Sequence, residues 1–335
     1  MRVAPAILAL SFVCVHCSLS AESGSADDAL DQAALTHGRD WVKNPAIVQL
    51  DSVDDIYAIS DPHGEYEILS RILASNRLIN AANPDPARVK WTGGNAVLVI
   101  AGDLIDKGPE SVEVIDLVRA LQTSAAQSNG RVIATLGNHE AEFLLDPRND
   151  KAMSTGEDAT GIDSELDALH IAPESLHSGT DATGRGVWLA SLPFAVRINS
   201  WFFAHGGNTS KLSMKDLTRK LEHALDRHGF GDSDVTGNDS ILEAQGWYGP
   251  PDDDRAGRKA ADALGVKHIV FGHDPGAFGE HGRIRASKNG VLVKIDTAMG
   301  MHLGSDIGKP FLLHVKTAHD EVEVLDEHGL ASALP

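Results

Sequence analysis

The sequence predicts an α/β fold from residue 56 onward, and three observations support this class. First, short and wholly apolar runs alternate with segments whose apolar residues recur at helical spacing. Second, several of these runs stop at a turn where glycine or another small residue meets aspartate, asparagine or histidine, and ligands of α/β folds bind at such strand ends. Third, 42% of the 335 residues are apolar, which is enough to bury a sizeable core.

The first half of the chain supplies three strands and two helices. Strands are expected at 56–59, 96–101 and 132–135, because the runs are apolar throughout, as in strands buried on both faces. Between them, the apolar positions of 68–73 and of 112–121 recur at helical spacing. In a fold of this class the carboxyl ends of the strands lie together.

The second half continues the pattern around two insertions. Residues 145–185 are polar and rich in Gly, Asp and Ser. Residues 208–262 have the patterns of helices and loops, and the sequence Pro-Pro-Asp-Asp-Asp at 250–254 interrupts regular structure. We expect these two segments to form a partly helical cap. Further strands are expected at 194–198, 201–204, 268–271, 291–295, 311–315 and 321–325.

The N-terminus has the composition of an export signal. Arg2 precedes an apolar stretch at 4–15, and small residues at 18–20 suit cleavage before Ala21. We therefore predict a signal peptide at 1–20, a leader at 21–50, a folded domain at 51–335, and a periplasmic or secreted location. Both cysteines, Cys14 and Cys17, lie in the signal, so the mature chain has no disulfide and no thiolate ligand.

The charge of the chain limits its partners. The formal net charge is −19, and such an acidic surface repels nucleic-acid backbones and anionic membranes. No run after the signal approaches the roughly 18 apolar residues of a membrane span. We therefore expect no nucleic-acid partner and no stable membrane anchor. An anionic substrate would need a local reversal of the field, which a bound metal ion provides.

Polar residues of metal-ligand type follow five of the predicted strands. Oxygen and imidazole donors without thiolate suit manganese, iron or zinc, and an Asp placed between two sites can bridge two ions. One such Asp is more often a helix cap, but caps do not call for histidine, so five such ends favour a metal centre. The residues are Asp61, His63, Asp103, Asp106, Asn138, His139, His205 and His273.

The segments SDPHGE, GDLIDKGPES, LGNHE, AHGG and FGHD, in this order, resemble the signature series of the calcineurin-like metallophosphoesterases. LGNHE without a preceding arginine is similar to the bacterial-type, Shewanella-like branch of the phosphoprotein phosphatases. The resemblance covers roughly residues 55–300. It implies the metallophosphoesterase fold, in which two mixed β-sheets pack as a sandwich flanked by helices.

The resemblance also implies roles for individual residues. Two divalent metal ions would be bound, the first by Asp61 and His63, the second by Asn138, His205 and His273, with Asp103 bridging both. A metal-bound hydroxide would attack phosphorus, and His139, oriented by Asp106, would protonate the leaving group as general acid. Asn138 and Lys107 would contact the substrate phosphate.

Three positions depart from the pattern of the family. Ser60 replaces a turn glycine, and Lys107 replaces an arginine, which keeps the charge but loses the planar two-pronged grip on phosphate. Gly249 stands where a second phosphate-binding arginine is expected after the Gly-Trp-Tyr motif. Arg255 or Arg258 could take its place, although both are more simply surface charges.

We therefore expect an exported phosphatase that hydrolyses phosphate monoesters, on phosphoserine, phosphothreonine or phosphotyrosine in proteins or peptides or on a small phosphoester. One alternative is a dinucleoside polyphosphate or nucleotide hydrolase on the same binuclear site, which should present a stacking pocket after His205 or near Trp247. A second alternative is an inactive metal-binding interaction module. Lys107 and Gly249 motivate that alternative, and the intact Asp106 and His139 argue against it.

Overall fold

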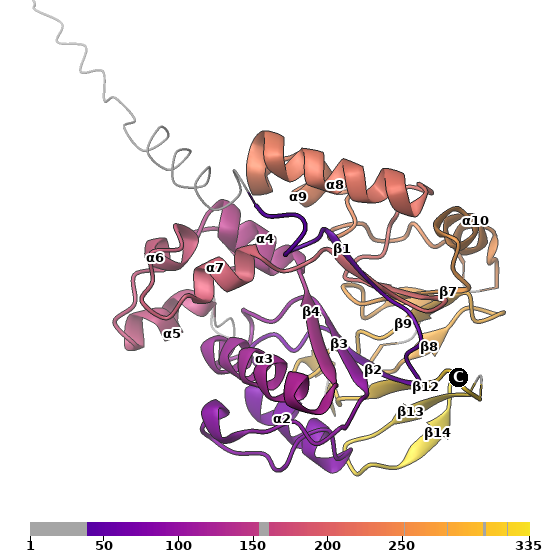
Figure 1. Ribbon diagram of the computed structural model, residues 1–335, viewed down its shortest axis with the longest axis horizontal. Coiled ribbons are helices and arrows are strands. Elements are labelled where there is room, and N and C mark those ends of the chain that lie inside the picture. The colour runs from indigo at the N-terminus through magenta and orange to yellow at the C-terminus, as the bar shows by residue number, and fades with distance from the viewer. Residues whose placement is uncertain (1–38, 154–160, 251, 280, 304–305, 320) are drawn as a thin grey trace, which may run out of the picture.

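Two mixed β-sheets form the centre of the fold (Figure 1). The computed structural model describes residues 39–335 apart from 154–160, 251, 280, 304–305 and 320, so the predicted signal peptide lies outside the described residues. In spatial order, the first sheet comprises β1 (Ile47–Leu50), β5 (Ala195–Ile198), β6 (Trp201–Ala204), β7 (His268–Phe271), β9 (Leu292–Lys294) and β8 (Arg285–Ala286). The second comprises β14 (Ala331–Ala333), β13 (Glu321–Leu325), β12 (Leu312–Lys316), β2 (Asp55–Ile59), β3 (Val97–Ala101) and β4 (Arg131–Thr135). A separate ribbon pairs β10 (His302–Leu303) with β11 (Asp306–Ile307).

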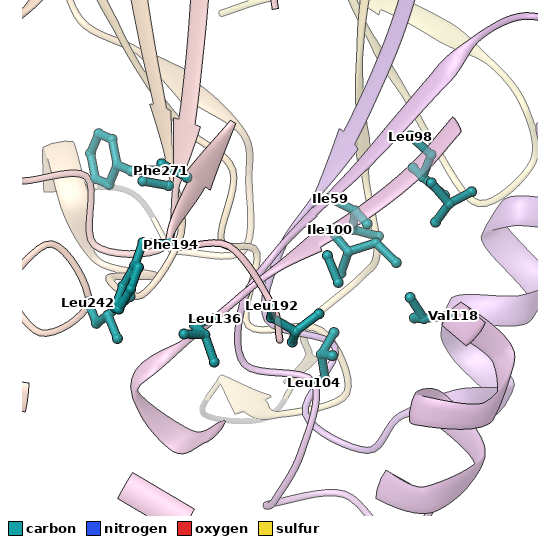
Figure 2. Packing of buried hydrophobic residues seen from close by; sticks show 14 of the residues in the cluster. Ile59, Leu98, Ile100, Leu104, Val118, Leu136, Leu192, Phe194, Leu242 and Phe271 are labelled. Carbon is teal, nitrogen blue, oxygen red and sulfur yellow. The ribbon is translucent and has the colours of Figure 1, made fainter. Parts of the chain in front are cut away.

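The alternation of side chains along each strand explains the layered core. On β3, Val97 and Val99 belong to the cluster between the sheets, where they are buried together with Phe203 of the opposite sheet. The intervening Leu98 and Ile100 belong to the second cluster and lie on the side of helix α3, as Figure 2 shows. A strand covered on both faces has no position for a polar side chain, and this is why its sequence is a continuous apolar run.

Helices cover the outer face of the second sheet and gather at one end of the molecule. Figure 1 shows α2 and α3 against β2–β4, and α4 to α7 grouped beyond the ends of these strands. The predicted periodicity of α3 is confirmed, since Val112, Ile115, Val118 and Leu121 are all buried. The helices are α2 (Tyr66–Ser75), α3 (Ser111–Ala125), α4 (Asn138–Leu145), α5 (Ile162–Ala168), α6 (Pro173–His177), α7 (Arg185–Ala190), α8 (Met214–His228), α9 (Ser233–Thr236) and α10 (Arg255–Leu264). Short 3₁₀ segments lie at Pro86–Arg88, Ala126–Ser128, Gly229–Gly231 and Ala277–Gly279.

The folded part begins earlier than the sequence suggests, because part of the predicted leader belongs to the first sheet. Ile47–Leu50 forms β1, which pairs in parallel with β5. The Arg39 guanidinium also donates to the carbonyl oxygens of Ala190, Ser191 and Leu192 at 2.8–3.0 Å. The partner strand of β1 lies about 150 residues away, so no local pattern marks this segment as a strand.

The two predicted insertions carry most of the remaining helices. Residues 145–185 contain α5 and α6 and the first residue of α7, and residues 208–262 contain α8, α9 and most of α10. Within the described part of the chain, no helix combines the length and hydropathy that crossing a membrane requires.

Candidate functional site

The residues singled out at five strand ends come together at one edge of the two sheets. Asp61 and His63 follow β2, and Asp103 follows β3. Asn138 and His139 open α4 directly after β4, while His205 follows β6 and His273 follows β7. All of these except His273 are at least 95% buried. Both sheets therefore contribute donors to a single cluster.

A first group of possible metal ligands consists of His63, Asp103 and His139, with one ligand atom of each lying within 4.8 Å of the others. The Nδ1 atom of His63 lies 3.1 Å from the Ile105 carbonyl oxygen. Its Nε2 atom is thereby directed at Asp103, whose Oδ2 is 3.4 Å away.

A second group consists of Asp103, His205 and His273, again within 4.8 Å. His205 Nε2 lies 3.2 Å from Asp103 Oδ1 and 3.0 Å from the Asn138 amide oxygen. Asp61 adjoins this second group: its carboxylate accepts the backbone N–H of His273 at 3.1–3.2 Å and approaches His205 Nδ1 to 4.0 Å. Asp103 is thus common to both groups, as a bridging ligand requires.

The charges of the site fit a bound cation. Burial, together with the Asp296 and Asp103 carboxylates, raises the pKa of Asp61 well above its ordinary value. Burial also lowers the pKa of His63, with Lys107 adding to the effect, and lowers that of His273 to about 4, with His205 adding. Neutral imidazole is the form that binds metals, and a cation would relieve the cost of ionising Asp61. The oxygen and imidazole donors present therefore fit manganese, iron or zinc.

His139 is held by a carboxylate on one side and faces the ligand groups on the other. Its Nδ1 atom lies 2.7 Å from Asp106 Oδ2, and its Nε2 atom is 3.9 Å from Asp103 Oδ2. Asp106 is fully buried, and its second oxygen accepts the backbone N–H of Ile162 at 3.0 Å. The imidazole is therefore fixed with Nε2 free to exchange a proton beside the ligand groups.

Glu140, which the sequence reasoning did not assign, holds two of the site loops together. Its carboxylate accepts the backbone N–H groups of Asp103, Leu104, Ile105 and Gly137 at 2.7–3.2 Å. Its position directly after the predicted Asn and His was the signal that could have found it. The loops it joins carry the Asp103 and Asn138 side chains, so Glu140 sets their separation.

A second unassigned carboxylate lies in the same cavity. Asp296 is 3% exposed, follows β9, and accepts the backbone N–H of Ala298 at 2.8 Å. Its negative charge helps to raise the pKa of Asp61. The pattern of a strand followed by aspartate, which identified Asp61 and Asp103, applies to Asp296 as well.

Glycines permit the close approach of the loops. A Cβ atom on Gly137 would lie 2.1 Å from Asp103 Oδ1, and one on Gly272 would lie 2.2 Å from Asp61 Oδ2. Real Cβ atoms do not come this close, so any side chain at either position would displace a carboxylate of the site.

The ligand groups form the floor of a cavity of about 880 Å³. Both insertions contribute to its wall, the first through Asp150, Lys151 and Met153 and the second through residues 238–245. The described residues that line it include no Phe, Tyr or Trp side chain. Trp247 instead donates its indole N–H to the Gly206 carbonyl oxygen at 2.8 Å and packs against Phe271, so it does not provide the stacking surface of a nucleotide site.

Two lysines line the cavity, one beside each ligand group. The Lys107 ammonium lies 2.7 Å from His63 Nε2. The Lys151 ammonium lies 2.7 Å from Glu142 Oε1 and 3.6 Å from Glu243 Oε1, and its charge acts on His273. Lys151 was not anticipated from the sequence, because an isolated lysine in a polar insertion carries no signal.

The arginines proposed as substitutes for Gly249 do not line this cavity. Arg255 is exposed and pairs with Asp253 at 2.6 Å. Arg258 lies beside Asp254 and borders a different cavity of about 490 Å³. Gly249 itself has a φ of +71°, a conformation that glycine adopts far more readily than arginine.

Comparison with protein families and curated proteins gives consistent results. The sequence profile of the family described as calcineurin-like phosphoesterase matches residues 55–277. Shewanella-like protein phosphatase 1 of Plasmodium berghei is 32% identical over 177 residues, which cover 52% of this chain and 45% of that protein. A symmetrical bis(5'-nucleosyl)-tetraphosphatase of Methylococcus capsulatus is 35% identical over 153 residues, or 45% of this chain and 42% of that protein. The chain thus spans less than half the length of these relatives.

Two solved structures show the same fold. The cold-active protein tyrosine phosphatase of a psychrophilic Shewanella species has a TM-score of 0.65 at 19% identity, covering 87% of this chain and 84% of that one. A protein serine/threonine phosphatase from Saccharomyces cerevisiae has a TM-score of 0.58 at 17% identity, covering 87% and 81%. At these identities the likeness concerns the fold alone.

Proposed function

Because this chain belongs to the calcineurin-like phosphoesterase family, we propose that it is a metal-dependent phosphatase that hydrolyses phosphate monoesters on proteins or peptides. The single observation that carries the proposal is the position of Asp103. This buried carboxylate is common to two ligand groups, beside a hydrogen-bonded histidine and aspartate pair, on the floor of a cavity.

We assign two divalent metal ions to these groups. Asp61, His63, Asp103, Asn138, His205 and His273 would hold them, and manganese, iron and zinc all suit such donors. When bound, the ions supply charge neutralisation for the phosphate and a nucleophile at neutral pH. The lowered pKa values of His63 and His273 support this assignment, because neutral imidazole is the form that binds metals. Against the effect of burial, the Asp103 and Asp61 carboxylates raise the pKa of His205 to about 10, and a bound cation would replace that proton.

His139 is assigned the general acid. Its Nδ1 atom is engaged by Asp106, so the proton for the leaving oxygen is carried on Nε2, which faces the ligand groups. The Asp106 carboxylate fixes the orientation of the imidazole, so that Nε2 is placed to donate to the leaving oxygen. The intact geometry of this pair also argues against an inactive interaction module, which has no use for a general acid.

Lysines take the place of arginines in binding the phosphate. Lys107 and Lys151 approach the two ligand groups from different sides, together with the Asn138 amide. The Lys151 ammonium has three N–H donors and lies beside the carboxylates of Glu142 and Glu243, so it can contact a phosphate without leaving Glu142. A lysine contacts phosphate as a point charge, without the two-pronged geometry of arginine.

The wall of the cavity favours phosphopeptides over dinucleoside polyphosphates, although curated relatives include enzymes of both names. The described lining has no Phe, Tyr or Trp side chain for a base to stack on, and its wall carries Asp150, Asp239 and Glu243 against two lysines. Beyond the phosphate held by the two ions, the rest of a tetraphosphate chain would meet more carboxylates than ammonium groups on this wall.

The test is a hydrolysis panel on the protein stripped of metal and reloaded with Mn, Fe or Zn in turn. Phosphoserine, phosphothreonine and phosphotyrosine peptides are compared with a dinucleoside tetraphosphate. We expect turnover of phosphopeptides that depends on added metal and is lost in Asp103→Asn. Preferential cleavage of the tetraphosphate would support the nucleotide hydrolase instead, and bound metal with no hydrolysis of any substrate would support the inactive module.

We also propose that the protein is exported, on the basis of the signal-like composition of residues 1–20. N-terminal sequencing of the protein from its native host tests this proposal: a mature chain that begins at Ala21 is expected, and an intact Met1 would contradict it.

A further inference from the structure

We propose that the insertion helix α5 positions the general acid pair through the backbone N–H of Ile162, which makes the insertion part of the catalytic apparatus. The inference rests on the proposed function, because it assumes that His139 protonates the leaving group. Ile162 is a positioning residue in this account, since it acts on the reaction only through Asp106.

The Asp106 carboxylate is fixed from both of its oxygens. Oδ2 lies 2.7 Å from His139 Nδ1, and Oδ1 accepts the Ile162 N–H at 3.0 Å. The side chain is fully buried, so water does not replace a lost partner easily. A hydrogen bond to an ionised group is among the stronger ones in proteins, and this one sets the plane of the carboxylate and hence the direction of the imidazole.

Helix α5 is itself fixed against the elements that carry Asp106. Ile162 and Leu166 are fully buried, and Glu165 accepts the backbone N–H of Val112, the second residue of α3, at 2.8 Å. The preceding residue of α3, Ser111, accepts the backbone N–H of Asp106 through its hydroxyl at 3.1 Å. The beginning of α3 therefore connects α5 to the Asp106 loop by a second route.

The approach to α5 leaves no room for a side chain. A Cβ atom on Gly161 would lie 2.0 Å from the Ala152 carbonyl oxygen. The same carbonyl accepts the backbone N–H of Asp163 at 3.1 Å. The chain is thus packed closely where it delivers the Ile162 N–H, which is the condition for a fixed hydrogen bond rather than an incidental one.

A misdirected general acid has a distinctive kinetic signature. Protonation of the leaving oxygen matters for a poor leaving group such as a serine alkoxide, and matters little for a good one such as nitrophenolate. Loss of the Ile162 hydrogen bond should therefore slow phosphoserine hydrolysis more than p-nitrophenyl phosphate hydrolysis. A change that only loosens the fold would lower both rates together.

Ile162→Pro and Ile162→Ala separate the N–H from the side chain. Proline is tolerated at the first helical position, and the extended backbone of Gly161 (φ −85°, ψ 165°) suits the residue before it. Proline removes the N–H and sets its Cδ against Asp106 Oδ1, so the carboxylate must turn away, whereas alanine keeps the N–H and removes most of the side chain. We expect I162P to lower kcat on a phosphoserine peptide by about 10- to 100-fold more than on p-nitrophenyl phosphate, and I162A to change both rates by the same factor.

A double variant tests whether Ile162 acts through His139. If it does, adding I162P to His139→Asn should cause little further loss on the phosphoserine peptide. Equal losses on both substrates in I162P, or additive losses in the double variant, would overturn the inference. An inactive wild-type protein would instead refute the proposed function, so the two failures are distinguishable.

A second pair of variants applies if I162P does not fold. Glu165→Met removes the acceptor for the Val112 N–H, and Glu165→Gln keeps it. We expect E165M to show the same substrate-selective loss in smaller degree. E165Q should keep the wild-type ratio of the two rates. Glu174→Met, in helix α6 of the same insertion, is the matched control because Glu174 is exposed and its carboxylate pairs with Arg148, away from the Asp106 loop. Equal behaviour of E165M and E174M would contradict the inference.

Discussion

Several side chains of the site stand on backbone in the left-handed region, which is uncommon outside glycine. Such a conformation costs roughly 1–3 kcal/mol at each residue and persists only where the surrounding structure enforces it. The buried strands behind these turns provide that enforcement, and the turns direct the side chains into one cavity. The residues are Asp61, His63, Asp103, Asp106, Lys107 and His273, with φ between 42° and 66°.

His139→Asn separates the two roles open to this residue. His139 belongs to the first ligand group and is also paired with Asp106. If it is the general acid, turnover on an alkyl phosphate should fall by about 10²- to 10⁴-fold while metal content stays unchanged. Metal analysis and steady-state kinetics on the same sample make the measurement, and a loss of bound metal would identify His139 as a ligand instead.

Lys151→Met should weaken phosphate binding more than catalysis. We expect KM for a phosphopeptide and the inhibition constant of inorganic phosphate to rise about tenfold, with kcat within about threefold. Lys220→Met is a matched control, because Lys220 is similarly exposed, pairs with Asp234 at 3.0 Å, and lies on α8 away from the cavity. If KM and the inhibition constant change equally in both variants, Lys151 does not contact the phosphate.

At the scale of elements, the strands made of apolar runs were predictable and the shortest edge strands were not. The strands 201–204 and 268–271 have the predicted bounds, because runs of apolar residues define where a buried strand begins and ends. The strand 321–325 also has its predicted bounds, on an alternation of Glu and Val. The edge strands β1, β8 and β14 were missed, since they are two to four residues long and their pairing depends on distant partners. Helix α4 was missed because its first three residues, Asn138, His139 and Glu140, are buried although they are polar. Its buried positions therefore do not form an apolar pattern in the sequence.

The contact between α5 and α3 should make stability depend on pH. Burial and the neighbouring Glu113 carboxyl raise the pKa of Glu165 from 4.5 to about 9. The folded protein therefore holds this proton more tightly than the unfolded chain does. The resulting stabilisation is complete below about pH 4.5 and is lost as the pH rises towards about 9.

Urea unfolding of the wild type and of Glu165→Gln at pH 5 and pH 8.5 measures this effect. Relative to E165Q, the wild type should lose free energy of unfolding between the two pH values. Glu174→Gln provides the control. Hydrogen bonds lower the pKa of Glu174 below 4.5, so this carboxyl group does not change its charge between pH 5 and pH 8.5. A difference between wild type and E165Q that does not change with pH would contradict the assignment.

At the scale of the molecule, the site is assembled where the strand ends of both sheets meet, from residues spread over more than 200 positions. The motifs were sufficient to predict the family, which the comparisons confirm, and the convergence of the ligands. They could not reveal Lys151 or the Ile162 N–H, because these act through spatial proximity or through the backbone, whereas the strand-end pattern applies to Asp296 and was overlooked there. Sequence patterns identify donors, whereas the wall and the supports of the cavity depend on the fold.

The most direct test of the central claim is a metal titration of the stripped protein with phosphatase activity followed in parallel. If Asp103 bridges two ions, activity should rise to a plateau at two ions per chain, and Asp103→Asn should lose both the second ion and turnover. Full activity in the stripped protein would contradict the account. So would maximal activity of the wild type without any bound ion.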